Sequence, residues 1–232
     1  MQIKEAIILA GGLGTRLKNV VPNLPKCMAP VAGKPFLYYL ISFLQTNGIK
    51  KFIFSVGYMH EIIEDYLKNN FSKLNYKISL ENEPLGTGGA IKLACEKASE
   101  KNILICNGDT LFKIHVTALS SFHIECDADC TLCLKPMTNF DRYGVVELDK
   151  NGSVKSFKEK QFYKSGLING GVYALNISNF LKENLPQKFS FENDYLEKQV
   201  GKKKLYGIVQ DEYFIDIGIP EDYKRAEKEF RN

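Results

Sequence analysis

The first half of the chain alternates short apolar segments with segments whose apolar residues recur at helical spacing. Such alternation is typical of strands that pair in parallel and of connecting helices that cover both faces of the sheet. The pattern therefore predicts an α/β fold with a mostly parallel central sheet. The predicted strands are residues 6–10, 52–56, 76–80 and 103–106, and the predicted helices are residues 36–45, 61–67 and 88–98.

The second half is less regular and is predicted to contain antiparallel strands. Residues 144–148 and 154–159 flank the segment Asp149-Lys150-Asn151-Gly152, whose Asn-Gly pair is typical of a hairpin turn. Because no linker separates the two halves, we expect residues 1–232 to form a single domain, with the antiparallel region as one wall of a cleft. Further strands are predicted at residues 171–175, 204–209 and 213–217, before a final helix that begins at residue 220.

Composition excludes several classes of protein. Hydrophobic residues make up 44% of the chain and charged residues 25%, as in a globular protein. The net charge of +4 is spread out apart from residues 202–204, so no nucleic-acid partner is expected. No apolar run approaches the roughly 20 residues of a membrane span, which favours a cytoplasmic location without a membrane partner. The six cysteines lie in apolar segments and are expected to be buried thiols.

A glycine-rich turn follows the first predicted strand, in the run Leu9-Ala10-Gly11-Gly12-Leu13-Gly14-Thr15-Arg16-Leu17. Glycine lets a phosphate approach the backbone amides closely, and an arginine offers a planar fork that suits phosphate oxygens. The run is neither a Walker loop nor a dinucleotide fingerprint, because the spacing of both differs. A tight turn without a ligand is the alternative. Downstream, a proline-rich loop could aim Lys26 at a ligand, although a lone lysine is more often a solvated charge.

Several motifs along the chain, taken in their order, resemble those of the sugar-1-phosphate nucleotidyltransferases. The resemblance spans nearly the whole chain, and within the family it is strongest to guanylyltransferases that act on D-glycero-α-D-manno-heptose 1-phosphate. It implies a Rossmann-like three-layer fold with an inserted antiparallel sugar-binding region. After the glycine-rich turn, the motifs are Pro25-Lys26, Gly33-Lys34-Pro35, Pro84-Leu85-Gly86-Thr87-Gly88-Gly89-Ala90, Asn107-Gly108-Asp109, Tyr143-Gly144-Val145, Glu159-Lys160, Asn169-Gly170-Gly171 and Asp216-Ile217-Gly218-Ile219-Pro220-Glu221-Asp222-Tyr223.

The resemblance implies transfer of GMP from GTP to a sugar 1-phosphate, with a nucleoside triphosphate and the sugar 1-phosphate as partners and a homodimer as a possible assembly. It implies catalytic roles for Arg16 at the β- and γ-phosphates and for Lys26 at the α-phosphate and the incoming sugar phosphate. The implied nucleotide-binding residues are Leu9, Ala10, Gly11, Gly12, Gly14, Thr15, Glu81, Pro84, Gly86, Thr87 and Gly108. The implied sugar-phosphate-binding residues are Gly144, Glu159, Lys160, Asn169 and Gly170.

The same resemblance implies a magnesium site at Asp109 and Asp216, which can be examined on physical grounds. Asp109 follows an apolar strand, where ligand sites gather in open α/β sheets. Asp216 interrupts another apolar strand, and a carboxylate there costs free energy unless it is paired or bound to a cation. Two carboxylates with phosphate oxygens suit magnesium, which prefers oxygen ligands. A turn-capping role for Asp109 and structural use of both acids are the alternatives.

The choice of base and sugar is less determined by the residues. An ionised carboxylate only accepts hydrogen bonds, so Glu81 fits the adjacent N1–H and N2–H donors of guanine best and uracil next. Glu81 facing water or pairing with a lysine is the alternative, and Lys158-Glu159-Lys160 also reads as a solvated charge run. Uridylyl transfer to a hexose or amino-sugar 1-phosphate, cytidylyl transfer, and a silent regulatory subunit that binds nucleotide sugar remain open.

Overall fold

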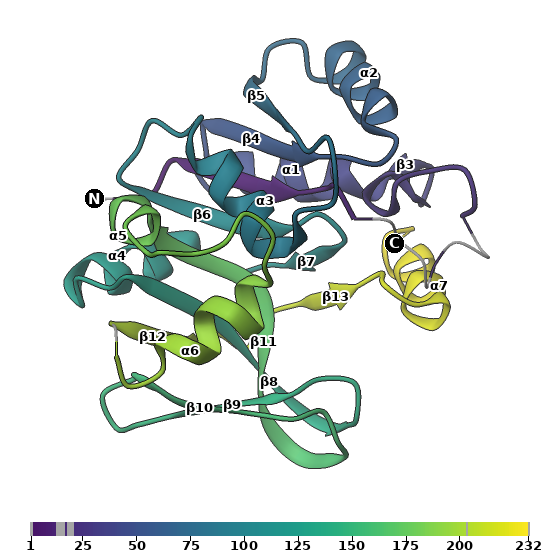
Figure 1. The fold of residues 1–232 in the computed structure, drawn as a ribbon. Helices are drawn as coiled ribbons and strands as arrows, with labels where there is room; N and C mark the ends of the chain where they lie inside the picture. Colours follow the sequence, from purple (N-terminus) through teal and green to yellow (C-terminus); the bar gives the residue numbers. More distant parts are fainter. Residues whose placement is uncertain (1, 13–16, 18–20, 203, 232) are drawn as a thin grey trace.

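The structure is a computed structural model that describes residues 2–12, 17, 21–202 and 204–231. Its largest element is a single nine-stranded sheet (Figure 1). The strands of this sheet are β1 (Glu5–Leu9), β4 (Lys51–Val56), β5 (Asn75–Leu80), β6 (Asn102–Asn107), β8 (Cys130–Phe140), β9 (Val145–Leu148), β10 (Val154–Lys158), β11 (Tyr163–Asn176) and β12 (Leu205–Val209). Two small sheets pair β2 (Pro30–Val31) with β3 (Lys34–Pro35) and β7 (Thr110–Phe112) with β13 (Phe214–Asp216).

The strands run in the order β10-β9-β11-β6-β1-β4-β5, with β8 paired to β11 and to β12. β1 pairs in parallel with β4 and β6, and β4 pairs in parallel with β5, as the alternating pattern predicts. β11 runs antiparallel to β6, β8 and β9, so the antiparallel region continues the main sheet (Figure 1). After β1 the chain forms β4 and β5 on one side of β1, and it then crosses over to form β6 on the opposite side of β1. The carboxyl ends of β1 and β6 therefore form a topological switch point, where ligands bind in open α/β sheets.

Helices cover both faces of the sheet, which confirms the predicted three layers. Side chains of successive strand residues point to opposite faces, so Ala6 and Ile8 join one core cluster while Ile7 joins the other. The first cluster includes residues of α1 (Phe36–Thr46), α2 (His60–Asn70), α4 (Val116–Glu125) and α7 (Pro220–Glu229). The second includes residues of α3 (Gly86–Cys95), α5 (Ile177–Leu181) and a π-helix (Phe191–Leu196) that continues into α6 (Glu197–Gln199).

Several elements differ from the sequence-based predictions, and helix α4 and strand β11 show why. Helix α4 was not predicted, because Ser120 and His123 lie on its buried face and interrupt the apolar periodicity. Strand β11 begins at Tyr163 rather than at residue 171, because its first half carries exposed and half-buried residues that do not alternate regularly. In the described part of the chain, no helix has the length and apolar character that a membrane crossing requires. All six cysteines lie in that part as free thiols, and five of them are buried.

The buried His123 links α4 to the sheet as a neutral imidazole. Its Nδ1 lies 2.9 Å from Thr131 Oγ1 and its Nε2 lies 3.4 Å from Asn102 Oδ1, so one nitrogen can accept while the other donates. Burial lowers the pKa of His123 from 6.5 to about 4, against the opposing effect of Asp129 and Asp127. The unfolded chain therefore binds a proton between these two pH values that the folded protein excludes.

We expect acid to destabilise the fold through His123. Because stability rises with pH wherever the unfolded state binds more protons, the free energy of unfolding should fall by about 2 kcal/mol from this group between pH 7 and pH 5. Urea unfolding at both pH values measures this change. His123→Gln should flatten the slope, whereas His115→Gln should keep it, because the His115 side chain is 70% exposed. Equal slopes in the wild type and His123→Gln would contradict this assignment.

Candidate active site

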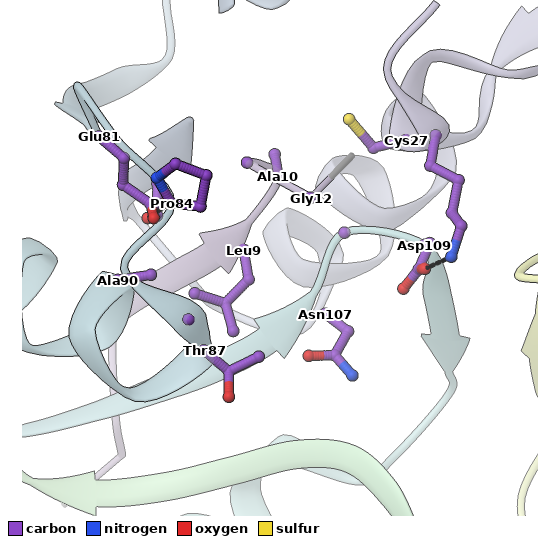
Figure 2. A pocket seen from close by; sticks show the side chains of 15 residues that line it. Leu9, Ala10, Gly12, Cys27, Glu81, Pro84, Thr87, Ala90, Asn107 and Asp109 are labelled. Carbon is purple, nitrogen blue, oxygen red and sulfur yellow. Dashed lines mark hydrogen bonds and ion pairs between the residues drawn. The ribbon is translucent and has the colours of Figure 1, made fainter. Parts of the chain in front are cut away.

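A cavity of about 520 Å³ opens at the carboxyl ends of β1 and β6, at the switch point of the sheet. Four segments that are distant in sequence contribute to it, together with Ser55 of β4 and Glu81 after β5 (Figure 2). The segments supply Leu9, Ala10, Gly11 and Gly12 after β1, Lys26 and Cys27 from a short 3₁₀ helix (Lys26–Met28), Pro84, Gly86, Thr87 and Ala90 around the start of α3, and Asn107, Gly108 and Asp109 after β6.

The cavity brings together most of the predicted nucleotide-binding residues. Leu9, Ala10, Gly11, Gly12, Glu81, Pro84, Gly86, Thr87 and Gly108 all line it, as do Lys26 and Asp109. Gly14, Thr15 and Arg16 lie outside the described residues. Four further lining residues were not predicted, namely Cys27, Ser55, Ala90 and Asn107. Ala90 and Asn107 belong to predicted motifs without having been assigned a role, and Cys27 directly follows the Pro25-Lys26 motif. Ser55 lies inside an apolar strand, and its place beside the cavity follows only from the pairing of β4 in the folded sheet.

Two glycines allow the cavity walls to approach closely. A Cβ atom on Gly11 would lie 2.6 Å from Glu81 Oε1, and one on Gly108 would lie 2.7 Å from the carbonyl oxygen of Leu9. Real Cβ atoms essentially never come so near to another heavy atom. The glycine-rich turn therefore has a packing role that brings the Glu81 carboxylate against the backbone beyond β1.

Glu81 forms one end of the cavity, and Asp109 lies at the other end in Figure 2. The backbone N–H of Leu85 donates to Glu81 Oε2 at 3.1 Å, and Ser55 Oγ donates to Oε1 at 3.4 Å. Burial raises the pKa of Glu81, and these two hydrogen bonds oppose the rise. Within the described chain, its partners are these groups and not the lysine of the alternative interpretation. A carboxylate held in this way presents acceptors to whatever occupies that end.

The opposite end carries a close ion pair. Lys26 Nζ lies 2.6 Å from Asp109 Oδ2, and the two side chains are only 16% and 26% exposed. Asp216 reaches the same region because β13 pairs with β7, and the N–H of Ile217 donates to the carbonyl oxygen of Asp109 at 3.0 Å. Asp216 Oδ1 accepts from Gly218 N at 2.7 Å.

The chemistry of this end suits a hard cation that is bound jointly by protein and ligand. Among the residues that the structure describes, no group of three or more His, Cys, Asp or Glu side chains is arranged for a metal ion. Two neighbouring aspartates supply only part of a coordination shell. Magnesium is usually bound in this way, by one or two carboxylates with water and substrate phosphate oxygens. The donor set therefore fits magnesium better than a metal that needs an all-protein cage.

The predicted sugar-side residues do not line the cavity, and they fall into two groups. Glu159 and Lys160 are exposed in the loop between β10 and β11, where a solvated charge run would also lie. Gly144 lies beside that loop, and a Cβ atom there would be 2.4 Å from the carbonyl oxygen of Lys158. Asn169 and Gly170, in contrast, lie in β11 directly before Gly171, which approaches Asn107 of the cavity lining.

A bulge in β11 brings Asn169 and Gly170 to that position, where the pairing with β8 shifts register between Asn169 and Tyr173. Gly171 adopts φ +69°, and a Cβ atom on it would lie 2.6 Å from the side-chain nitrogen of Asn107, which lines the cavity. A Cβ on Gly170 would overlap the ring of Phe112 in β7. The two consecutive glycines therefore let β11 approach the ends of β6 and β7.

Comparison with known proteins places this geometry in a family. The family described as nucleotidyl transferase matches residues 5–232. A D-glycero-α-D-manno-heptose 1-phosphate guanylyltransferase of Aneurinibacillus thermoaerophilus is 52% identical over 98% of this chain and 99% of its own length. The enzyme of the same name from Campylobacter jejuni is 46% identical over 94% of this chain and 96% of its own length.

A solved structure agrees with these sequence matches. The crystal structure of HddC from Yersinia pseudotuberculosis complexed with GMP-PN has a TM-score of 0.88 and 38% sequence identity, covering 98% of this chain and 100% of that protein. The predicted resemblance is thereby confirmed over nearly the whole chain. The chain belongs to the nucleotidyl transferase family of enzymes.

Proposed function

We propose that this enzyme transfers GMP from GTP to D-glycero-α-D-manno-heptose 1-phosphate and releases pyrophosphate. The observation that carries the proposal is the cavity at the switch point, which has a carboxylate acceptor at one end and the Lys26–Asp109 pair at the other. Two relatives that match this chain along almost their full length bear the name of that activity. The choice of the heptose as the sugar rests on the names of these two relatives, since the cavity residues alone do not distinguish the heptose from another sugar.

The nucleotide would lie along the cavity from Glu81 to Asp109. Guanine presents adjacent N1–H and N2–H donors, which match the two oxygens of Glu81. The backbone of Gly11 and Gly12 would lie against the phosphates, together with Gly14, Thr15 and Arg16. The further proposed nucleotide contacts are Leu9, Ala10, Pro84, Gly86, Thr87 and Gly108.

The reaction would be an in-line displacement at the α-phosphorus. A phosphate oxygen of the sugar 1-phosphate forms the new P–O bond, and the bond to the pyrophosphate oxygen breaks. Because the nucleophile is already anionic, alignment and charge stabilisation suffice without a general base. Lys26 would contact the α-phosphate and the incoming phosphate, and Arg16 would bind the leaving β- and γ-phosphates.

Asp109 and Asp216 are the residues that would hold a magnesium ion, which when bound would offset the charge on the phosphate oxygens. Lys26 has a second task at this end. Its 2.6 Å contact with Asp109 keeps the ammonium at the edge of the cavity, from which it can turn to a phosphate. On the sugar side we propose contacts from Gly144, Glu159, Lys160, Asn169 and Gly170.

The proposal extends to the setting of the enzyme. Residues 1–232 would act as one catalytic domain, alone or as a homodimer. The cytoplasm is the proposed location, since it contains nucleoside triphosphates. The product would be an activated glycosyl donor, of the kind that sugar transfer into a cell-surface polysaccharide consumes.

Pyrophosphate release tests the proposal directly. GTP, UTP, CTP, ATP and dTTP would be crossed with a panel of sugar 1-phosphates that includes the heptose and mannose, in the presence of magnesium. We expect the highest kcat/KM with GTP and the heptose. Another favoured pair would keep the chemistry and contradict the base or sugar assignment. Tight nucleotide-sugar binding without turnover would instead support a regulatory subunit.

A further inference from the structure

Residues 187–189, which do not line the cavity, pack against the start of α3. The N–H of Gly88 donates to the carbonyl oxygen of Phe189 at 3.0 Å, and the N–H of Phe189 donates to that of Leu85 at 3.0 Å. A Cβ atom on Gly88 would lie within 2.7 Å of three atoms of the Phe189 ring, and one on Gly89 would lie 2.3 Å from the carbonyl oxygen of Gln187. The glycines after Thr87 thus let residues 187–189 pack against the helix start that lines the cavity.

The same segment continues into the π-helix, whose second residue is Glu192. Thr87 Oγ1 donates to Glu192 Oε2 at 2.8 Å, and Ser190 Oγ donates to the same oxygen at 3.2 Å. The other oxygen, Oε1, accepts from the hydroxyl of Tyr173 at 3.4 Å. Tyr173 in turn accepts from Asn169 Nδ2 at 2.8 Å. A chain of hydrogen bonds therefore runs from the nucleotide side to the bulge of β11.

The direction of each hydrogen bond in this chain is determined by its neighbours. Thr87 Oγ1 accepts from the N–H of Phe191 at 2.8 Å and donates its own proton to Glu192. Tyr173 accepts from Asn169 and likewise directs its proton to Glu192. Asn169 Oδ1 accepts from the N–H of Gly171 at 3.1 Å, which sets the orientation of the amide. Only a group that accepts at both of its ends can complete this arrangement, and an ionised carboxylate does so.

We infer that Glu192 is a positioning residue that holds the nucleotide side and the sugar side of the active site in register, through Thr87 at one end and through Tyr173 and Asn169 at the other. The inference rests on the proposed function for the roles of Thr87 and Asn169. Glu192 itself is not among the residues that line the cavity, so it acts through these neighbours. Its place in a π-helix is consistent with such a role, because π-helical turns recur at functional sites.

Replacing the Glu192 carboxylate by an amide should keep its hydrogen bond to Thr87 and break the one to Tyr173. In Glu192→Gln, the single oxygen should stay with Thr87 and Ser190, which supply two donors, and the amide nitrogen should then face Tyr173. The Tyr173 hydroxyl would lose its acceptor inside the protein, so Tyr173 would no longer be fixed as the hydrogen-bond partner of Asn169. Loss of one hydrogen bond to a charged group corresponds to roughly a tenfold effect. We therefore expect the KM for the sugar 1-phosphate to rise about tenfold, and the Kd of a non-hydrolysable GTP analogue to change less than about twofold.

A second substitution separates positioning from a merely structural effect. Tyr173→Phe removes the hydroxyl that Glu192→Gln leaves without an acceptor. In the Tyr173→Phe background, Glu192→Gln should therefore raise the sugar KM by less than about twofold, rather than about tenfold. Glu192→Ala, which removes both acceptor oxygens, should weaken the binding of both the nucleotide and the sugar 1-phosphate. Glu197→Gln is the matched control, because the Glu197 side chain is exposed five residues further along.

Steady-state kinetics with both substrates and calorimetry with the GTP analogue decide the inference. Sugar KM and nucleotide Kd values of Glu192→Gln and Glu192→Ala that match those of Glu197→Gln would overturn it. Equal effects of Glu192→Gln in the wild-type and Tyr173→Phe backgrounds would also overturn it. If the wild-type enzyme released no pyrophosphate with any sugar of the panel, that result would count against the proposed function instead. The nucleotide Kd of Glu192→Ala would then still decide whether Glu192 supports the nucleotide side.

Discussion

Replacing Asp109 by Asn should lower kcat by at least about 10³-fold while leaving the fold intact. Asn keeps the shape of the side chain but removes the negative charge that Lys26 contacts at 2.6 Å. Without that charge, the proposed magnesium site loses a carboxylate ligand, and Lys26 loses the group that holds it at the edge of the cavity. Because Asp109 is partly exposed, the free energy of unfolding should change by less than about 1 kcal/mol. Pyrophosphate release and urea unfolding measure the two effects.

A second acid in a lysine pair provides the control for this variant. Asp211 lies 2.5 Å from Lys135, as a side chain that is 75% exposed and outside the cavity lining. Asp211→Asn should therefore keep the wild-type kcat. If Asp109 and Lys26 act in the same step, Lys26→Met should reduce the rate of Asp109→Asn far less than that of the wild type. A kcat of Asp109→Asn within about tenfold of the wild type would contradict the role of this carboxylate.

The parallel part of the fold could be predicted from sequence because its signal is local. In β1, successive apolar residues serve opposite faces, so the strand appears as a continuous apolar run between turns. Helix α4 could not be predicted in this way, because Ser120 and His123 have their polar partners inside the protein. A polar residue with a buried partner looks like a surface residue in the sequence, and only the tertiary contact explains it.

The site shows the same division between local and distant information. The glycine-rich turn and the loop at the start of α3 are contiguous motifs, and the predicted residues that line the cavity from them are Leu9, Ala10, Gly11, Gly12, Pro84, Gly86 and Thr87. Strand β7 was not predicted, so the sequence pattern did not show that β13 pairs with it, and only the resemblance placed Asp216 together with Asp109. The link from Thr87 through Glu192 to Asn169 joins three segments of the chain. None of these residues forms a motif with the others, so their connection becomes visible only in the folded structure.

Replacing Glu81 by Gln should reverse much of the proposed preference for guanine. A carboxylate offers two acceptors to the N1–H and N2–H donors of guanine, whereas an amide places an N–H group against one of them. A site built for hydrogen bonds rejects the mismatched partner strongly, so kcat/KM for GTP should fall on the order of 10³-fold. Adenine pairs a donor with an acceptor on the corresponding edge and fits the amide better. The ratio of GTP to ATP activity should therefore fall further than GTP activity alone.

The exposed Glu83, two residues further along, provides the control, and Glu83→Gln should keep the wild-type base preference. An unchanged GTP to ATP ratio in Glu81→Gln would show that the base is read elsewhere.

The pH dependence of GTP use tests the same carboxylate in the unmodified enzyme. Burial raises the pKa of Glu81 against the opposing hydrogen bonds from Leu85 and Ser55. Protonation would turn one acceptor into a donor that faces a guanine N–H, so the KM for GTP should rise as the pH falls through this pKa. The rise should begin at a higher pH than an ordinary glutamate would give, and it should be absent in Glu81→Gln. Titration of the triphosphate affects both enzymes equally, so the ratio of their KM values isolates Glu81. A ratio that stays constant across the acidic range would mean that the ionised carboxylate does not contact the base.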